Sequence, residues 1–402
     1  MILKLAWRNI WRQKRRTWIL ITAVTIGFFG LFFFMVITEG AVKQAVKNII
    51  DSGIGHIQIH RQGYLKDPEV KKIIKNPDSV IDKLNFPEIE LISKRVNLQG
   101  VLYSPQETSP VQVIGGVLEK EKLLTKFEEY IVEGDFPKAE SEILIGNKLA
   151  EILDVKLNEK VVLSSSDINA EISSYAFRVG GIFKSPSMEV NKFIVLIDIT
   201  AASKISSYKN MANEIVIRLK EEKFIPDTLN KIKDILNSEY EVLSWGDVNP
   251  SLKYQFEVLS KSMLLFGFII LFGASFGIMN VFFMSIFERM REFAILRAMG
   301  LKPFQLKKLI VLEGILIGLI SIIIGSFLNS FLYLYLSFKG LNLSVFARSL
   351  EMWGSGSIIY PSLSFENSMG LISLVIIVVF LSIILPARKS AKIIITEALR
   401  YV

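Results

Sequence analysis

Long apolar runs without a charged side chain alternate with charged segments along the 402 residues of this chain. Four such runs are 22, 26, 25 and 21 residues long, at residues 17–38, 262–287, 314–338 and 367–387. A helix needs about 20 apolar residues to cross the hydrocarbon core of a bilayer. The pattern therefore predicts four transmembrane helices, one near the start of the chain and three near its end.

Basic residues are concentrated in the short segments beside these helices. Residues 1–16 carry six Lys or Arg and no acid, and residues 288–308 carry six basic and two acidic residues, whereas residues 39–258 carry 28 basic and 33 acidic residues. Cytoplasmic segments of membrane proteins are enriched in Lys and Arg. We therefore expect a multi-pass protein of the cytoplasmic (inner) membrane with both termini in the cytoplasm. Since the basic charge lies beside the membrane, no nucleic-acid partner is expected.

Hydropathy and charge together divide the chain into nine segments. In chain order these are a cytoplasmic amphipathic helix (1–16), transmembrane helix 1 (17–38), a large mixed α+β extracytoplasmic domain (39–258), transmembrane helix 2 (259–287), a cytoplasmic segment (288–308), transmembrane helix 3 (309–338), an extracytoplasmic loop (339–366), transmembrane helix 4 (367–387) and a cytoplasmic tail (388–402). The first helix places Leu3, Trp7, Ile10 and Trp11 on one face, which is typical of a helix in the headgroup layer. No signal-peptide cleavage site follows residues 17–38, so we interpret them as an uncleaved signal-anchor.

Short strand and helix patterns alternate through residues 39–258 and predict the mixed α+β domain. Strands are expected at 53–60, 89–118 (two strands around a turn), 158–165, 172–183, 192–197, 214–219 and 241–245, helices at 64–85, 119–132, 201–206 and 227–236, and a strand followed by a helix at 142–154. Two Gly-Gly pairs, at 115–116 and 180–181, lack the spacing of a phosphate-binding loop. We interpret both pairs as bulges or places of close backbone approach.

No catalytic constellation is visible in the sequence. The chain has no cysteine and only two histidines, His56 and His60. Residues four apart on a strand are separated by about 13 Å, too far for one shared metal ion, so we expect both on a solvent-exposed strand face. There is no G-x-S-x-G and no GxxxxGK[ST] motif. We predict a chain that is not an enzyme, with no catalytic residue, no metal site and no cofactor of its own.

The segment between the second and third apolar runs has the pattern of a short amphipathic helix. Glu288 and Glu292 are one helical turn apart, as are the oppositely charged Arg289 and Glu292, which can pair on a helix surface. Phe293, Ala294 and Leu296 form an apolar stripe. Gly300 fits the glycine that ends a helix, with a proline soon after it. We expect this helix to lie at the membrane surface between two spanning helices.

Small residues and one carboxylate interrupt the apolar runs. Gly273 and Gly277 in the second helix, and Gly314 and Gly318 in the third, are small-xxx-small pairs that predict close helix packing. Glu313 lies about one turn into the third helix, where an unpaired carboxylate is costly. We expect Glu313 to pair with a basic residue of the preceding segment at the membrane interface.

This layout resembles the permeases of MacB/FtsX/LolC-LolE-type ABC transporters. The residues that carry the resemblance are 287–300 (FERMREFAILRAMG), 386–392 (PARKSAK), 396–400 (TEALR), 7–16 (WRNIWRQKRR) and 143–150 (ILIGNKLA). The resemblance implies a permease dimer, homo- or heteromeric, and a separate ABC ATPase dimer that binds ATP and magnesium and docks on this chain. It assigns ATPase coupling to Glu288, Arg289, Arg291, Glu292, Phe293, Ala294, Leu296, Arg297, Ala298, Met299 and Gly300.

Three functions remain compatible with the resemblance. The first is release or export of lipoprotein from the cytoplasmic membrane, favoured by the large extracytoplasmic domain and the absence of a fused ATPase. The second is efflux of a drug or peptide through an adaptor. The third is a cargo-free mechanotransmitter that activates a cell-wall hydrolase, with a sensor that partners a kinase as a weaker variant.

Overall fold

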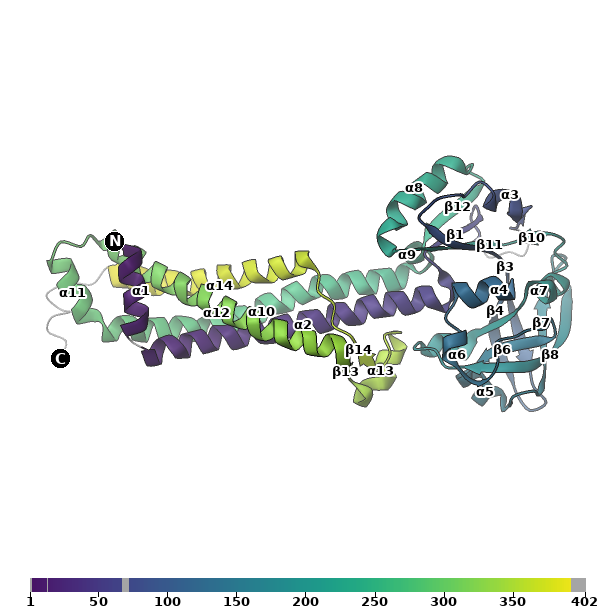
Figure 1. Ribbon diagram of the computed structural model, residues 1–402, viewed down its shortest axis with the longest axis horizontal. Coiled ribbons are helices and arrows are strands. Elements are labelled where there is room, and N and C mark those ends of the chain that lie inside the picture. The colour runs from purple at the N-terminus through teal and green to yellow at the C-terminus, as the bar shows by residue number, and fades with distance from the viewer. Residues whose placement is uncertain (1, 13, 67–71, 392–402) are drawn as a thin grey trace. The chain divides into compact units, whose positions relative to one another are not determined.

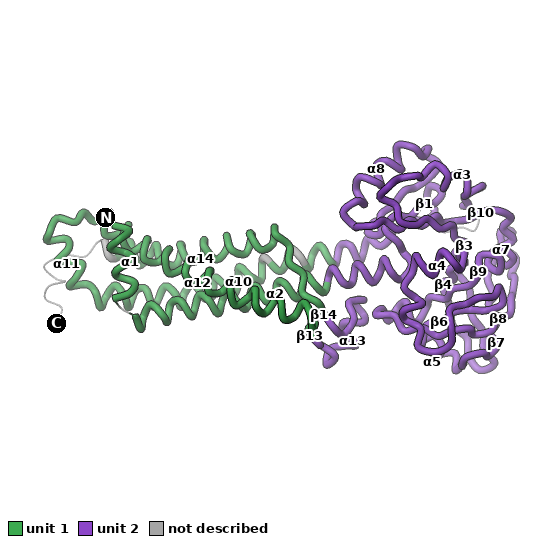
Figure 2. The backbone as a smooth tube through the Cα atoms, in the orientation of Figure 1, with its two compact units in different colours: residues 1–41, 256–341, 359–402 green, residues 42–255, 342–358 purple. Residues whose placement is uncertain are grey.

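The computed structural model describes residues 2–12, 14–66 and 72–391. The chain forms two compact units (Figure 2). The first comprises residues 1–41, 256–341 and 359–402 and is called the helix bundle below. The second comprises residues 42–255 and 342–358 and is called the α/β domain. The expected C-terminal motif at 396–400 lies outside the described residues.

Six helices contribute to the helix bundle, and four of them are long and apolar enough to cross a membrane, as predicted (Figure 1). The helices are α1 (Ile2–Arg12), α2 (Lys14–Ile49), α10 (Pro250–Glu288), α11 (Met290–Ala298), α12 (Pro303–Lys339) and α14 (Phe365–Ala391). The long helices extend beyond the uncharged runs because helical backbone continues into the flanking polar residues. Phe28, Leu309 and Val375 belong to the buried core of the bundle.

Close helix packing occurs at two of the four glycines proposed for it. A Cβ added at Gly314 would lie 2.1 Å from Ile383 Cδ1, and one at Gly318 would lie 3.1 Å from Val379 Cγ1. Helices α12 and α14 therefore touch where α12 carries no side chain. No described atom comes within 4 Å of a Cβ added at Gly273 or Gly277, so close packing of α10 at these two glycines stays a prediction.

The α/β domain is built on a ten-stranded mixed sheet with strand order β12-β1-β11-β3-β4-β9-β6-β8-β5, in which β7 also pairs with β3 and β8. The strands are β1 (Ile57–Arg61), β3 (Ile89–Tyr103), β4 (Thr108–Gly116), β5 (Ile131–Gly134), β6 (Glu142–Gly146), β7 (Lys160–Ser166), β8 (Ile172–Phe183), β9 (Ile194–Asp198), β11 (Glu214–Leu219) and β12 (Tyr240–Ser244). Shorter strands are β2 (Ile74–Lys75), β10 (Met211–Ala212), β13 (Leu341–Asn342) and β14 (Ile358–Ile359). The helices are α3 (Pro77–Ile81), α4 (Leu118–Leu124), α5 (Asn147–Leu153), α6 (Met188–Phe193), α7 (Ile199–Ser206), α8 (Ile225–Ile235), α9 (Trp245–Val248) and α13 (Ala347–Met352).

Strand β3 joins the two main hydrophobic cores of this domain. Its first half pairs with β11, and its second half pairs with β4 and β7. One core gathers residues such as Ile57, Ile217 and Ile232, and the other gathers residues such as Leu149, Phe177 and Ala202. At the middle of the strand, Arg95 is in register with both Glu214 and Gly116.

Both Gly-Gly pairs are places of close backbone approach, as predicted. A Cβ added at Gly115 would lie 2.2 Å from Ala202 Cβ, and one at Gly181 would lie 2.3 Å from Asp135 O. The second pair also coincides with a register shift between β6 and β8, which skips Gly180. Side chains at these positions would force the covering segments away from the sheet.

Two helix predictions were wrong in extent. Of residues 64–85, only Pro77–Ile81 is α-helical, and residues 74–75 pair instead with 211–212 as strands; residues 67–71 lie outside the described part. The helix expected at 119–132 ends at Leu124, and β5 follows at Ile131 because it pairs with β8. In both cases strand pairing overrides the local helical preference of charged residues.

The histidines are buried rather than exposed on a strand face. His60 is 1% exposed, and its Nδ1 and Nε2 atoms lie 2.9 Å from Asn213 O and Gln58 Oε1. Its ring stacks on Tyr64 at 4.9 Å between centroids. The prediction failed because β1 is an interior strand of the sheet, between β11 and β12, so alternation along it did not mark a solvent face.

Candidate functional site

The break between α10 and α11 positions the segment for which a coupling role was predicted. α10 ends at Glu288, and Arg289 leaves the helical conformation with φ −102° and ψ 11° before α11 begins. The C-terminal end of α11 is followed by Gly300 with φ 98°, a conformation that favours glycine. Pro303 then occupies the first turn of α12. A short helix is thus held between two long apolar helices by defined turns.

Arg289 and Glu313 form a buried ion pair at this break. Both residues are nearly buried, at 6% and 7% exposed. Arg289 Nη1 donates to Glu313 Oε2 at 2.9 Å, and Nη2 lies 3.5 Å from Oε1. The guanidinium also lies over the Phe293 ring, 4.9 Å from its centroid. Since an unpaired charge here would be costly, the pair fixes the start of α11 against α12.

The N-terminal helix contributes further polar contacts to the same place. Asn9 Nδ2 donates to Glu313 Oε1 at 2.6 Å. Arg12 pairs with Glu292, and Arg16, at the start of α2, pairs with Glu288. Glu292 also accepts from Arg289 Nε at 3.3 Å. The polar contacts of this cluster therefore join α1, α2, α10, α11 and α12, and the cluster is called the arginine–glutamate clamp below.

Sequence reasoning missed the N-terminal half of the clamp. The segment was interpreted as a membrane-surface helix, and the structure does leave Trp7 and Trp11 exposed while Ala6 and Ile10 are buried. The available signal was the spacing of Asn9 and Arg12, three residues apart in α1, which places both polar side chains on one helical stripe. That stripe faces the acidic residues of the predicted segment.

Helix α11 has a buried face and an exposed face. Phe293 and Ala294 are buried in the core of the bundle, and Leu296 packs against it. The exposed positions are Arg291, Ile295, Ala298 and Met299. Met299 is 71% exposed, and Ile295, one turn earlier, is 47% exposed. These four residues form an exposed patch in which two apolar side chains are flanked by a basic one.

The clamp is a network of ion pairs and hydrogen bonds. Among the described residues, no group of three His, Asp or Glu side chains is placed to hold a metal ion. Moving α11 away from α12 would separate Arg289 from Glu313, and moving it away from α1 would separate Arg12 from Glu292. Four apolar helices, an α/β domain and an amphipathic helix between the second and third spanning helices define an integral membrane transport subunit.

Comparison with known families gives the same class. Residues 17–235 match the MacB-like periplasmic core domain, and residues 264–395 match the FtsX-like permease C-terminal family. The chain therefore belongs to the ABC transporter permeases of the MacB/FtsX/LolC-LolE type.

Several curated relatives are distant but extensive. The lipoprotein-releasing system transmembrane protein LolC of Neisseria meningitidis serogroup B is 23% identical over 76% of this chain and 77% of its own length. LolC of Haemophilus influenzae is 22% identical over 79% of each chain. The pyoverdine export ATP-binding/permease protein PvdT of Pseudomonas fluorescens is 22% identical over 80% of this chain and 50% of its own length. Among solved structures, the extracellular domain of the transporter YknZ from Gram-positive bacteria is similar over 47% of this chain and all of that domain, with 12% identity and a TM-score of 0.35.

Proposed function

We propose that this chain is the permease subunit of an ATP-driven transporter whose ATPase is a separate subunit, and that the ATPase docks on the exposed patch of α11. The observation that carries the proposal is the two-sided character of α11. Its buried face and the arginine–glutamate clamp join it to the spanning helices, while Ile295 and Met299 remain exposed. Exposed apolar side chains rimmed by charge are typical of docking surfaces. ATP and magnesium would be bound by the partner.

The orientation follows from the charges beside the helices. The α11 segment and the start of the chain are strongly basic, so we place both in the cytoplasm and the α/β domain on the opposite side of the membrane. Movement of α11 on ATP binding would then pass through the clamp to α2 and α10, which are continuous helices of 36 and 39 residues.

Release or export of lipoprotein from the cytoplasmic membrane is the work that the relatives favour, because LolC proteins align over most of this chain. Drug or peptide efflux through an adaptor is the second candidate, favoured by the alignment with PvdT. A cargo-free mechanotransmitter that activates a cell-wall hydrolase is the third. A second permease would complete the transporter, as a homo- or heterodimer.

Docking is tested by purifying the tagged chain in mild detergent and identifying co-purified proteins by mass spectrometry. The double variant Ile295→Asp/Met299→Asp is expected to lose a co-purifying ATPase with a Walker motif, because charge is placed in the exposed patch. Ile172→Asp is the matched control, since Ile172 is an exposed isoleucine of the α/β domain, 81% exposed. Absence of any ATPase from the unmodified complex, or retention in the double variant, would contradict the docking proposal.

Cargo is tested with photocrosslinking residues at Phe34 of α2 and Leu265 of α10, both exposed positions in the half of each helix nearer its junction with the α/β domain. Lipoprotein release predicts capture of lipidated proteins at both positions. Capture of a soluble hydrolase, and only from positions in the α/β domain, would favour the mechanotransmitter.

A further inference from the structure

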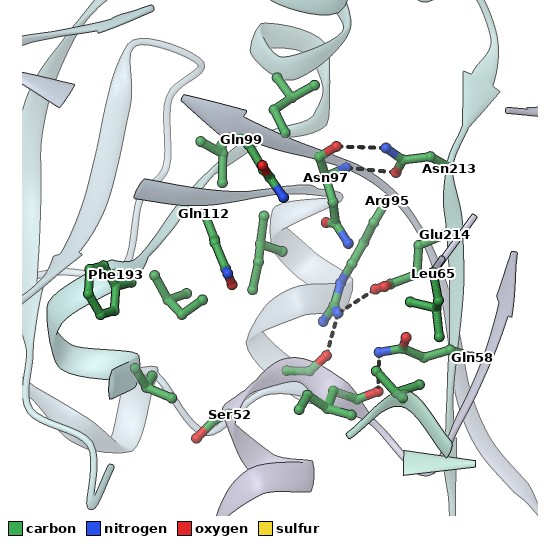
Figure 3. A pocket seen from close by; sticks show the side chains of 18 of the residues that line it. Ser52, Gln58, Leu65, Arg95, Asn97, Gln99, Gln112, Phe193, Asn213 and Glu214 are labelled. Carbon is green, nitrogen blue, oxygen red and sulfur yellow. Dashed lines mark hydrogen bonds and ion pairs between the residues drawn. The ribbon is translucent and has the colours of Figure 1, made fainter. Parts of the chain in front are cut away.

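A cavity of about 670 Å³ opens within the α/β domain, where β1, β3 and β4 meet the segments that precede β1 and follow β12 (Figure 3). Cavities of roughly 300–1,000 Å³ are typical of ligand sites. One side of this cavity is a sheet face, and the rest of the lining mixes apolar residues with polar ones. Ile54, Phe193 and Leu252 are among the apolar residues, and Ser52, Ser187 and Glu189 are among the polar ones. The cavity is separate from the clamp, which belongs to the helix bundle.

The sheet face that lines the cavity carries a row of carboxamides. Asn97 and Gln99 are two residues apart on β3, so both point to the same face, and Gln112 of β4 is directly opposite Gln99. Figure 3 shows these side chains aimed into the cavity. The Oδ1 atom of Asn97 is buried and has no hydrogen-bond partner among the described residues. Gln99 and Gln112 are exposed, so their carboxamide groups are accessible to a ligand in the cavity.

The charges around the cavity disfavour an anionic ligand. The guanidinium of Arg95 lines it but is already engaged by Glu121 through Nε and Nη2, at 2.9 and 2.7 Å, and by Glu214 through Nη1 at 2.9 Å. Glu189 adds a further carboxylate to the lining. The lining carboxylates Glu189 and Glu214 therefore outnumber the single arginine. His60 also lines the cavity, but its two ring nitrogens are engaged by Asn213 O and Gln58 Oε1.

We propose that this cavity binds an extended peptide segment that is neutral or weakly basic. A carboxamide offers both donors and an acceptor, as does a peptide group. Asn97 and Gln99 are two strand residues apart, which is about 6.8 Å. An extended peptide presents its backbone N–H and C=O groups on the same side every two residues, so it has the same spacing. The apolar residues of the lining, such as Ile54 and Leu252, would then contact every second side chain of the bound peptide, which a sugar would not supply.

The inference deepens the proposed function and rests on it for its biological meaning, since the peptide would be the polypeptide part of a cargo. The binding site lies in the α/β domain. It is next to residues Ile50–Ile54, the helical turn that continues α2 and meets the sheet. There Arg95 Nη1 also donates to Gly53 O, so an occupied cavity would adjoin the joint between this helix and the sheet.

The test is equilibrium dialysis of the full-length chain in detergent, without ATP or any partner, against N-acetylated hexapeptide amides of randomised Ser, Ala, Val and Lys, read by mass spectrometry. We expect saturable retention that falls at least about tenfold in Gln99→Leu/Gln112→Leu, since two hydrogen bonds to the peptide are lost while side-chain volume is kept. Gln112→Trp, which fills the cavity, is expected to abolish retention. Gln106→Leu, at an exposed turn outside the cavity, is the matched control.

Three results would overturn the inference. They are absence of saturable peptide retention by the unmodified chain, equal retention by Gln99→Leu/Gln112→Leu and Gln106→Leu, and preferential retention of chitotetraose or inorganic phosphate over the peptides. Thermal unfolding of each variant verifies that the fold is kept. Because dialysis needs no ATPase, peptide retention together with failure of the docking test would separate this site from the proposed coupling function.

Discussion

Among the residues that the structure describes, two arginines are buried, one in each compact unit, and their surroundings differ. Arg289 lies in the helix bundle against one buried carboxylate, Glu313, and one partly exposed carboxylate, Glu292. Arg95 lies in the α/β domain against two buried carboxylates, Glu121 and Glu214. Burial alone would lower the pKa of the Arg95 guanidinium, but these two carboxylates raise its pKa above the ordinary value.

The difference indicates where movement is possible. The partners of Arg95 lie on α4 and β11, which are fixed to the same sheet, and its donors are used within the interior. The partners of Arg289 lie on separate helices, and part of the clamp, such as the Arg12–Glu292 pair, is exposed. Exposed pairs contribute little and are easily exchanged. We infer that the ion pairs of Arg95 are permanent, whereas the exposed pairs of the clamp can exchange while Arg289–Glu313 persists.

The largest effect is expected from Arg95→Met. The substitution leaves Glu121 and Glu214 buried without a counter-ion, and removing one partner of a buried pair costs about 3–5 kcal/mol. The free energy of unfolding of the α/β domain, measured by chemical denaturation, should fall by at least that amount. Arg61→Met is the control, because Arg61 and Glu239 form an exposed pair. If Arg95→Met lowers the free energy of unfolding as little as Arg61→Met does, the ion pairs of Arg95 do not hold the α/β domain in place.

A smaller effect on stability but a larger one on coupling is expected from Arg289→Met. Glu313 would lose its charged partner and keep the hydrogen bond from Asn9, so we expect a loss of about 3 kcal/mol. ATPase activity of the assembled transporter should become independent of cargo, because α11 is no longer tied to α12. Arg12→Met is the control, since Arg12 and Glu292 are partly exposed. Coupled activity that survives in Arg289→Met would remove the clamp from the proposed mechanism.

Packing of the helix bundle is tested by Gly314→Leu and Gly273→Leu. The first substitution forces α12 away from Ile383 and should cost about 1–3 kcal/mol of stability in detergent. The second meets no described atom of this chain and should leave the isolated chain unchanged. Thermal unfolding followed by size-exclusion chromatography measures both. If Gly273→Leu instead lowers the yield of a permease dimer, its face of α10 contacts the second permease.

Periodicity correctly predicted the helices and strands whose formation depends on their own local sequence. The four apolar runs, the strand followed by a helix at 142–154 and the strand at 172–183 are all present, since length, alternation and turn residues suffice there. The predicted exposure of the histidines was wrong because their burial depends on segments far away in the sequence. His56 and His60 are buried because strands far along the chain flank β1.

The candidate site was predictable on one side only. The α11 segment carries a charge pattern that marks a cytoplasmic helix, and an isolated Glu313 in an apolar run calls for a counter-ion. That Arg289 rather than another basic residue supplies it depends on the turn at the end of α10. The contributions of Asn9 and Arg12 arise from α1 packing beside α12, roughly 300 residues away in sequence. Such tertiary proximity is not encoded in local periodicity.

The smallest predicted effect is a pH response confined to one unit, because the only histidines of the chain lie in the α/β domain. Burial, and then the nearby charge of Arg218, lowers the pKa of His56 to about 4. Its Nδ1 accepts a hydrogen bond from the Leu219 N–H at 3.2 Å, so the folded state favours the neutral ring. Below the unfolded-state pKa of about 6.5, only the unfolded chain gains a proton. Stability is therefore complete above pH 6.5 and falls as the pH is lowered toward 4.

Hydrogen exchange resolves this response by region. Proton linkage predicts that the free energy of opening falls by roughly 1.5 kcal/mol between pH 6.5 and pH 5. This fall should be seen for amides of β1 and β11 after correction for the intrinsic exchange rate. His56→Gln is expected to remove that pH-dependent loss even if it lowers stability at every pH, because glutamine does not titrate. Amides of α12 serve as the internal control and should show no such loss. An equal loss of stability for the amides of α12 would mean that the two units do not respond to pH independently. An unchanged pH dependence in His56→Gln would mean that His56 is not the titrating group. Either result would contradict the contrast between the fixed ion pairs of the α/β domain and the exchangeable pairs of the clamp.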